Sequence, residues 1–231
     1  MPPYFLDVGT GRALILLHGN GEDHTYFVDQ ITAFSGWCRV IAVDTRGHGQ
    51  TPRGVAPFTL DQFAEDLKAL LDMLSIPQAD ILGFSDGGNT ALLFALRYPD
   101  RVRRLVLVGA NLCPTGMKGS LWFSVWRDFL FAAVASLFRP EYHHKRELNA
   151  LMALQPHIPS SRLRRLQIPV LVMAGARDVI RNCHTLRIAF ALPHATLALL
   201  PGGHDLAKDV PALFNQTVLA FLSSGEKEKE S

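Results

Sequence analysis

The residues with the clearest chemical meaning lie between Ile81 and Asn89, where an apolar run leads into Gly83-Phe84-Ser85-Asp86-Gly87. Glycines on both sides allow a strand and a following helix to approach closely around a sharp turn, which exposes the central serine. Its hydroxyl then lies at the amino end of the helix, where amide dipoles favour developing negative charge. Ser85 is therefore the predicted nucleophile of an acyl-transfer reaction.

A serine hydroxyl is a weak nucleophile at neutral pH, so a base must lie within reach and an acid must orient that base. Asp178 and His204 each follow a later apolar run with the pattern of a strand. Because the carboxyl ends of parallel strands meet at one edge of a sheet, both side chains are expected beside Ser85. We predict His204 as the base and Asp178 as its orienting acid. Asp205 and Asp209 lie too close to His204 in the sequence to be preferred.

A pocket for the oxyanion is expected from backbone amides rather than from side chains. The run His18-Gly19-Asn20-Gly21 follows an early apolar strand, and its glycines allow the backbone to turn amides inward. We assign one N–H group to Asn20 and the other, by its position after the nucleophile, to Asp86. This chemistry requires no cofactor, and none is predicted.

These strand ends require a scaffold in which they meet. Short apolar runs alternate with longer amphipathic ones, which is the pattern of an α/β fold with a mostly parallel sheet flanked by helices. The predicted strands are Tyr4–Val8, Ala13–Leu17, Arg39–Val43, Ala79–Gly83, Leu105–Val108, Val170–Ala174 and Thr196–Leu200. The first two, joined by Gly9-Thr10-Gly11, are expected to form a hairpin. The clearest predicted helices are Leu60–Leu74, Asn89–Tyr98 and Pro211–Leu222, the last with Asp209 as its cap.

The segment from residue 111 to residue 167 interrupts the alternation with helical, aromatic-rich sequence. We interpret 111–167 as a lid over the carboxyl edge of a core formed by 1–110 and 168–224, with 225–231 as a disordered tail. The lid aromatics are expected to pack the lid and in part to line an apolar acyl pocket: Trp122, Phe123, Trp126, Phe129, Phe131 and Phe138. A short lid favours small substrates.

The composition sets outer limits on partners. The chain has 231 residues, of which 48% are hydrophobic and 19% charged, and 23 basic and 21 acidic residues give a net charge of +2. These values are typical of one globular domain with a sizeable core. Without a basic excess, nucleic acid is not an expected partner. We expect a small-molecule ester substrate and a chain that is a monomer or a homodimer.

The cysteines indicate a reducing compartment, because they are few, odd in number and far apart: Cys38, Cys113 and Cys183. The first residues lack the basic and then apolar pattern of a secretory signal, so a cytoplasmic location is expected. The apolar stretch Ser120–Phe138 holds Arg127 and Asp128 near its middle, where burial in lipid is most costly. No membrane span is therefore predicted.

Four spaced motifs together resemble the α/β-hydrolase superfamily. They are His18-Gly19-Asn20-Gly21, Asp44-Thr45-Arg46-Gly47-His48-Gly49, Gly83-Phe84-Ser85-Asp86-Gly87-Gly88 and Gly203-His204. The continuation through Tyr98-Pro99 and Val108-Gly109-Ala110-Asn111 is similar to the biphenyl-hydrolase-like branch, which contains the α-amino-acid ester hydrolase valacyclovir hydrolase. The resemblance implies a serine hydrolase with the α/β-hydrolase fold. The short segment before the oxyanion turn predicts a sheet of seven strands that lacks the extra first strand common in the family.

The same resemblance implies a role for Asp86, because in that branch the acid beside the nucleophile receives the α-ammonium group of the substrate. A carboxylate beside Ser85 could pair with a cation two bonds from the scissile carbonyl and orient it for attack. An aspartate in the first turn of a helix also stabilises the helix through its dipole, so both interpretations of Asp86 stay open. Asp86 is not favoured as the nucleophile, because Gly83 and Gly87 bracket Ser85.

The sequence thus predicts a serine hydrolase of small carboxylic esters, with α-amino-acid esters as a candidate class. Two alternatives remain: a C–C bond hydrolase acting on vinylogous diketones with the same triad, and a catalytically silent member of the fold that only binds a ligand. His18 and His48, in glycine-rich turns, are expected to be structural hydrogen bonders. His143-His144 lacks a spaced third ligand, so no metal site is predicted.

Overall fold

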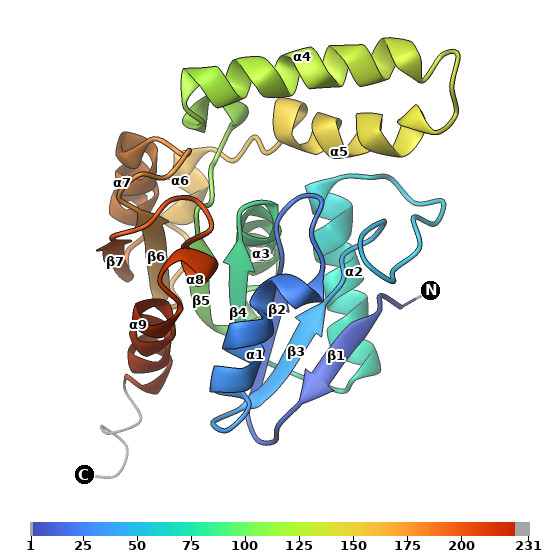
Figure 1. The fold of residues 1–231 in the computed structure, drawn as a ribbon. Helices are drawn as coiled ribbons and strands as arrows, with labels where there is room; N and C mark the ends of the chain where they lie inside the picture. The colour runs from blue at the N-terminus through green and yellow to red at the C-terminus, as the bar shows by residue number, and fades with distance from the viewer. Residues whose placement is uncertain (1, 225–231) are drawn as a thin grey trace, which may run out of the picture.

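The computed structural model describes residues 2–224, and within them seven strands form one sheet in the order β1-β3-β2-β4-β5-β6-β7 (Figure 1). The strands are β1 Phe5–Val8, β2 Ala13–Leu17, β3 Arg39–Val43, β4 Ala79–Phe84, β5 Val102–Val108, β6 Val170–Gly175 and β7 Ala195–Leu200. Neighbouring strands are parallel except for β1 and β3. The predicted fold, its mostly parallel sheet and its seven strands are confirmed.

The expected hairpin between the first two strands is wrong, because β1 pairs with β3 instead. The antiparallel register places Phe5 opposite Val43, whereas β2 lies on the other side of β3, with Ala13 opposite Arg39. Every residue of β2 is buried, so its backbone needs hydrogen-bonded neighbours on both sides, and β3 and β4 provide them. The short and partly exposed β1 is suited to the edge of the sheet.

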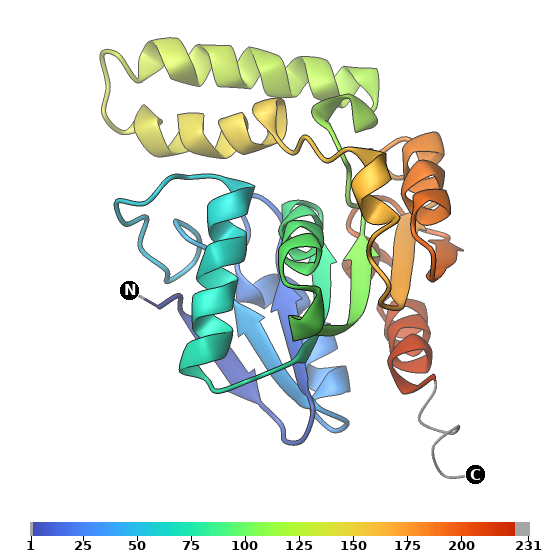
Figure 2. The same ribbon diagram turned by 180° about the vertical axis from the view of Figure 1, so that it is seen from behind.

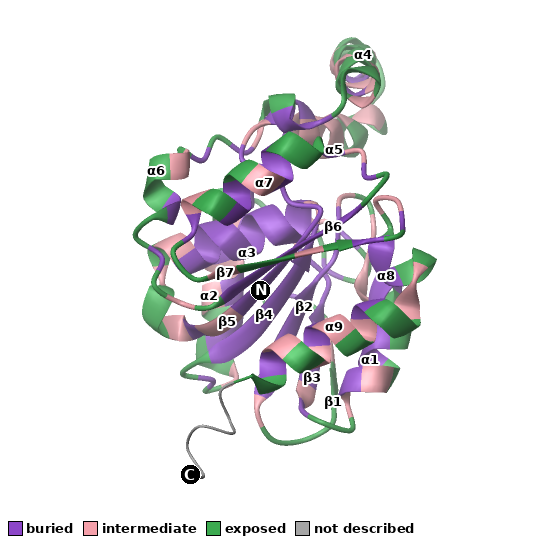
Figure 3. Ribbon diagram, turned by 90° about the vertical axis from the view of Figure 1, so that its left-hand side faces the viewer, coloured by how far each residue is buried: buried purple, intermediate pink, exposed green. Residues whose placement is uncertain are grey.

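Helices cover both faces of the sheet (Figures 1 and 2). The helical elements are η1 His24–Phe27, α1 Val28–Phe34, α2 Leu60–Met73, α3 Asp86–Arg97, η2 Pro99–Arg101, η3 Pro114–Gly116, α4 Gly119–Ala135, α5 Tyr142–Leu154, α6 Ser160–Leu163, α7 Asn182–Ala191, α8 Leu206–Asp209 and α9 Pro211–Ser223. Side chains of α2, α3 and α7 share one apolar cluster with Ile15 and Ile81, and those of α1, α8 and α9 share another with Leu14 and Leu82. Alternate residues of the central strands therefore enter different cores, which makes these strands continuously apolar and buried (Figure 3).

Two predicted features of the helices differ from the structure. α3 begins at Asp86 rather than at Asn89, because tertiary packing holds a first turn that contains two glycines, which are poor helix formers. Asp209 does not cap α9, since Val210 occupies the capping position without a side-chain bond. The Oδ2 atom of Asp209 instead accepts the N–H group of Gly203 at 2.5 Å.

The segment between β5 and β6 forms a helical layer above the carboxyl edge of the sheet, with α5 between α4 and the core (Figures 1 and 2). A small apolar cluster joins this layer to the loop after β6: Met117, Val125, Ala153 and Ile180. Trp126 and Phe129 pack against this cluster, as expected of lid aromatics. Phe131 is partly exposed, but its ring packs against that of Tyr142 in α5, with the two centroids 5.8 Å apart. The expectation is wrong for Phe123 and Phe138, whose side chains are mostly exposed. Among residues 2–224, no helix has the length and apolarity needed to cross a bilayer.

Candidate active site

Ser85 lies in the turn between β4 and α3 and has a left-handed backbone, with φ of 52° and ψ of −119°. This conformation costs a non-glycine residue about 1–3 kcal/mol and persists only where neighbouring structure fixes it. Gly83 allows the required closeness, since a Cβ atom there would lie 2.3 Å from the carbonyl oxygen of Gly87. The Ser85 amide donates to the carbonyl of Val108 at 2.8 Å. The turn therefore presents the serine hydroxyl at the carboxyl edge of the sheet.

His204 and Asp178 form a hydrogen-bonded row with Ser85. The Nε2 atom of His204 lies 3.1 Å from Oγ of Ser85, and its Nδ1 atom lies 2.8 Å from Oδ1 of Asp178. A carboxylate only accepts, so Nδ1 carries the proton and Nε2 offers its lone pair to the hydroxyl. Asp178 is fully buried and also accepts the Ile180 N–H group at 2.8 Å. The row has the geometry for base-assisted attack by the serine.

Gly109, at the end of β5, leaves room for the imidazole of this row. Its φ is 58°, and a Cβ atom there would lie 2.8 Å from Cε1 of His204. On another side of the imidazole, the ring of Phe84 lies with its centroid 4.9 Å from that of His204. The position of the base is therefore limited by close packing as well as by its hydrogen bonds.

The amides expected to bind the oxyanion belong to Asn20 and Asp86. Within residues 2–224, neither of these two N–H groups donates to another group. The N–H group of Gly19, by contrast, donates to Oε2 of Glu22 at 3.0 Å. The Gly19 amide is thus occupied, whereas the Asn20 amide stays available as the expected donor.

Glu22 is a residue of the site that the sequence did not reveal. It lies three positions after Gly19 and holds the oxyanion loop in shape through the Gly19 amide. Burial raises the pKa of its carboxyl group to about 7, with the Gly19 hydrogen bond and Lys208 acting in the opposite direction. The only sequence signal is an acid that follows the glycine-rich turn, and such acids are common in turns.

Asp86 is buried, and its carboxylate is held by two neutral amide groups. Asn20 Nδ2 donates to Oδ2 at 2.9 Å, and Asn89 Nδ2 donates to Oδ1 at 3.2 Å. Burial raises the pKa of Asp86, while these two hydrogen bonds and the more distant His204 lower it. In the described part of the chain, no lysine or arginine contacts this carboxylate. It is therefore a buried acid without a basic partner.

A cavity of about 10 Å³ adjoins Asp86 and the oxyanion loop. Its lining residues are His18, Gly19, Asn20, Thr45, His48, Phe63, Asp86, Gly87, Thr90 and Leu151. Two buried polar atoms of this lining form no hydrogen bond with another described residue: Nε2 of His48 and Oγ1 of Thr90. Nδ1 of His48 lies 3.0 Å from the carbonyl oxygen of Arg46, which only accepts, so Nε2 carries a lone pair. The cavity has room for one water-sized group surrounded by acceptors.

His18 has the structural role expected from the sequence. Its Nδ1 atom donates to the Gly19 carbonyl at 2.7 Å, and its Nε2 atom accepts the Thr45 N–H group at 3.0 Å. Burial lowers the pKa of His18 to about 4, so the ring is neutral near pH 7. His18 thus joins the oxyanion loop to the loop after β3.

The helical layer contacts the site through α5. The side-chain amide of Asn20 donates to the carbonyl of Leu148 at 3.0 Å, and Arg53 forms a paired hydrogen bond with Glu147 at 2.6 and 2.7 Å. α5 is therefore tied both to the oxyanion loop and to the loop after β3. His143 and His144 lie in the first turn of the same helix.

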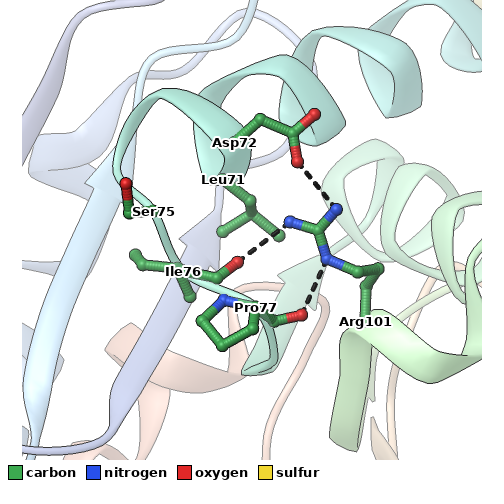
Figure 4. A pocket seen from close by; sticks show the side chains of 6 residues that line it. All are labelled: Leu71, Asp72, Ser75, Ile76, Pro77 and Arg101. Atoms are coloured by element: carbon green, nitrogen blue, oxygen red, sulfur yellow. Dashed lines mark hydrogen bonds and ion pairs between the residues drawn. The ribbon is translucent and has the colours of Figure 1, made fainter.

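A hollow of about 440 Å³ lies at the opposite edge of the sheet, between the end of α2 and η2 (Figure 4). The guanidinium group of Arg101 donates there to the carbonyls of Pro77 and Ile76 and to Asp72, at 2.7 to 2.9 Å. These contacts join the segment that precedes β4 to the segment that precedes β5. Because the guanidinium group is already engaged by three acceptors, the hollow has the character of a structural junction.

Comparisons with known proteins identify the family of the chain and several similar proteins. Residues 12–140 match the family described as the alpha/beta hydrolase fold. The protein named carbamate hydrolase RutD of Caulobacter sp. strain K31 is 31% identical, over 92% of this chain and 91% of its own. The 3-oxoadipate enol-lactonase 2 of Acinetobacter baylyi is 29% identical, over 91% of this chain and 88% of its own. The solved structure of a meta-cleavage product hydrolase from Pseudomonas fluorescens IP01 has a TM-score of 0.77 and 25% identity, over 96% of this chain and 94% of its own.

Proposed function

This chain belongs to the α/β-hydrolase fold family, and from that premise we propose that it is a serine hydrolase that cleaves small carboxylic esters through an acyl-enzyme on Ser85. The observation that carries the proposal is the row of Ser85, His204 and Asp178, joined at 3.1 and 2.8 Å. His204 takes the proton of the hydroxyl as Oγ attacks the ester carbonyl. Asp178 holds the imidazole in the required tautomer and stabilises the imidazolium that forms.

The remaining steps use the same groups. Negative charge on the carbonyl oxygen develops beside the amides of Asn20 and Asp86, which donate to no other group among residues 2–224. His204 gives its proton to the leaving alkoxide oxygen, and the alcohol departs. Water then attacks the acyl-enzyme while His204 takes its proton, and that proton returns to Oγ of Ser85 as the acid is released.

For the substrate, we propose an ester with a protonated primary amine close to the scissile carbonyl. A buried carboxylate without a basic partner is unfavourable, and a bound ammonium group would compensate the charge of Asp86. The adjoining cavity adds the lone pair of His48 Nε2 and the hydroxyl of Thr90. These three acceptors equal in number the three N–H bonds of an ammonium group, which is close to a water molecule in size.

The test of this substrate class compares kcat/KM for an α-amino-acid ester and for its N-acetyl form. We expect wild type to prefer the free amine by roughly 10- to 100-fold, because a charge-assisted hydrogen bond contributes about 1.5–3 kcal/mol. Asp86→Asn should abolish most of this preference, and Thr90→Val should reduce it. Thr185→Val is the matched control, since its Oγ1 atom is also buried and without a hydrogen bond but lies in α7. Equal rates on both esters in wild type would exclude the amine-bearing class.

A second candidate reaction, C–C bond hydrolysis, is supported by the similarity to the meta-cleavage product hydrolase. Such a reaction on a vinylogous diketone would use the same serine and histidine. The conjugated carboxylate of that substrate would, however, come close to the carboxylate of Asp86, and the two like charges would repel each other. An ester fits the site better, and the relative named enol-lactonase acts, by its name, on a cyclic ester. A panel of p-nitrophenyl esters and vinylogous diketone acids separates the two reactions. Faster turnover of the diketone acids would favour C–C cleavage.

A further inference from the structure

The outermost helix, α4, is apolar around most of its circumference. Val125 and Ala132 are buried on the side that packs toward α5. The opposite side presents Leu130 and Val134 to solvent, at 56% and 61% exposure. Helices that are apolar on all sides are normally buried on all sides. The exposed side of α4 therefore has the composition of an interface.

The exposed side chains follow a regular spacing. They lie at alternating intervals of four and three positions along α4 and the turn that continues it: Phe123, Arg127, Leu130, Val134 and Leu137. This spacing keeps a single seam facing a partner helix over two heptads. Phe131 and Phe138 widen the seam at 59% and 81% exposure. We refer to the six apolar side chains among these as the α4 face.

We propose that the α4 face pairs with the same face of a second copy of the chain. The two α4 helices would lie antiparallel about a two-fold axis near Leu130. Phe123 of each copy then lies opposite Leu137 of the other, and Leu130 meets its own symmetry mate. The six side chains present roughly 700 Å² of apolar area, close to the ~800 Å² per partner of a standard protein interface.

A second copy fits this face better than a lipid surface does. A helix that lies in a bilayer interface combines an apolar face with an excess of lysine and arginine, which attracts anionic lipid. The charged residues of α4 are Arg127 and Asp128, whose side chains pair with each other at 2.9 Å. The helix thus carries no net charge, and the alternating spacing of its exposed side chains by four and three positions is that of a helix pair.

Pairing through this face has a consequence for the site. α4 packs on α5, and the Leu148 carbonyl of α5 accepts the side-chain amide of Asn20. A second copy on the outer side of α4 therefore holds α5 in place over the oxyanion loop. In the fold, α4 is the outermost helix of the layer above the carboxyl ends of the strands (Figure 1).

Sedimentation velocity over a micromolar concentration series tests the pairing. We expect wild type to reach twice the 25.5 kDa mass of one chain. Leu130→Glu should be monomeric, because it places two like charges together on the axis. Phe190→Glu is the control, since Phe190 is 85% exposed on α7, outside the α4 face, and should leave the dimer intact. Near-ultraviolet circular dichroism verifies that both variants are folded.

Cysteine cross-linking tests the antiparallel register, in a Cys113→Ser, Cys183→Ser background that lacks the two more accessible native thiols. Leu130→Cys should form a disulfide-linked dimer by itself. Phe123→Cys should cross-link only when mixed with Leu137→Cys. A wild type that is monomeric throughout the series, or a dimer unaffected by Leu130→Glu, would overturn the proposal. A monomer that floats with phosphatidylglycerol-containing vesicles, and loses this property in Leu130→Glu, would assign the face to lipid instead.

Discussion

The Oγ atom of Ser85 lies 3.1 Å from Nε2 of His204, although 119 positions separate the two residues in the sequence. Ser85 follows β4, His204 follows β7, and β5 and β6 lie between these strands in the sheet. Because all four strands are parallel, their carboxyl ends reach the same edge. The sheet brings the two side chains together, and changes that disturb either loop should affect activity more than stability.

Asp178→Asn should lower kcat for a short p-nitrophenyl ester by about 10³- to 10⁴-fold with little change in KM. An asparagine can donate to Nδ1 of His204, which favours the tautomer that cannot accept the proton of Ser85. Steady-state kinetics measures the effect. Asp205→Asn, an exposed neighbour of His204, is the control and should leave kcat within a few-fold of wild type. Similar losses in both variants would remove Asp178 from the proposed role.

Gly109→Ala should impair catalysis through the position of the base. The added methyl group would lie 2.8 Å from Cε1 of His204, and an error of about 1 Å in a reacting group can cost roughly 100-fold in rate. Gly11→Ala is the matched control, because Gly11 also has a positive φ, of 90°, but a Cβ atom there meets nothing within 4 Å. Comparison of kcat and melting temperature for the two variants tests the prediction. Full activity in Gly109→Ala would mean that His204 tolerates displacement.

Glu22 predicts a pH dependence of stability. Burial raises the pKa of its carboxyl group from 4.5 to about 7, so the folded state binds this proton more tightly than the unfolded chain does. The resulting stabilisation is fully present below pH 4.5 and is lost as the pH rises to about 7. Urea titrations measure the free energy of unfolding of wild type and of Glu22→Gln at each pH. The value for wild type minus that for the variant should fall between pH 4.5 and about 7 and stay constant at higher pH. A difference that rises with pH would contradict the burial of this acid.

The local sequence was sufficient to predict which residues lie at the carboxyl ends of the strands and could form the triad. Ser85 could be located because an elbow needs glycines at fixed positions between a strand and a helix, and Asp178 and His204 because each follows a run with the pattern of a strand. The fold followed from the same alternation of apolar runs. These features depend on short segments whose conformations the neighbouring residues already favour.

The features that sequence could not predict depend on contacts between distant segments. The choice of β3 rather than β2 as the partner of β1 is decided by which edge of the sheet remains free. The first turn of α3 contains two glycines and is held by packing rather than by helix propensity. The role of Glu22 depends on its hydrogen bond with the Gly19 amide. The role of His48 depends on the cavity that it lines, where its Nε2 atom has no partner among the described residues. The exposure of Phe123 follows from its position on the outer side of α4.

The central claim is that Ser85 is the nucleophile, and labelling with a fluorophosphonate probe followed by peptide mass spectrometry tests it most directly. In wild type, the probe should modify Ser85. Ser85→Ala should lose both labelling and hydrolysis of a short p-nitrophenyl ester, with an unchanged circular dichroism spectrum. Labelling of another residue together with retained hydrolysis in Ser85→Ala, or a wild type that neither reacts with the probe nor hydrolyses any ester, would contradict the claim.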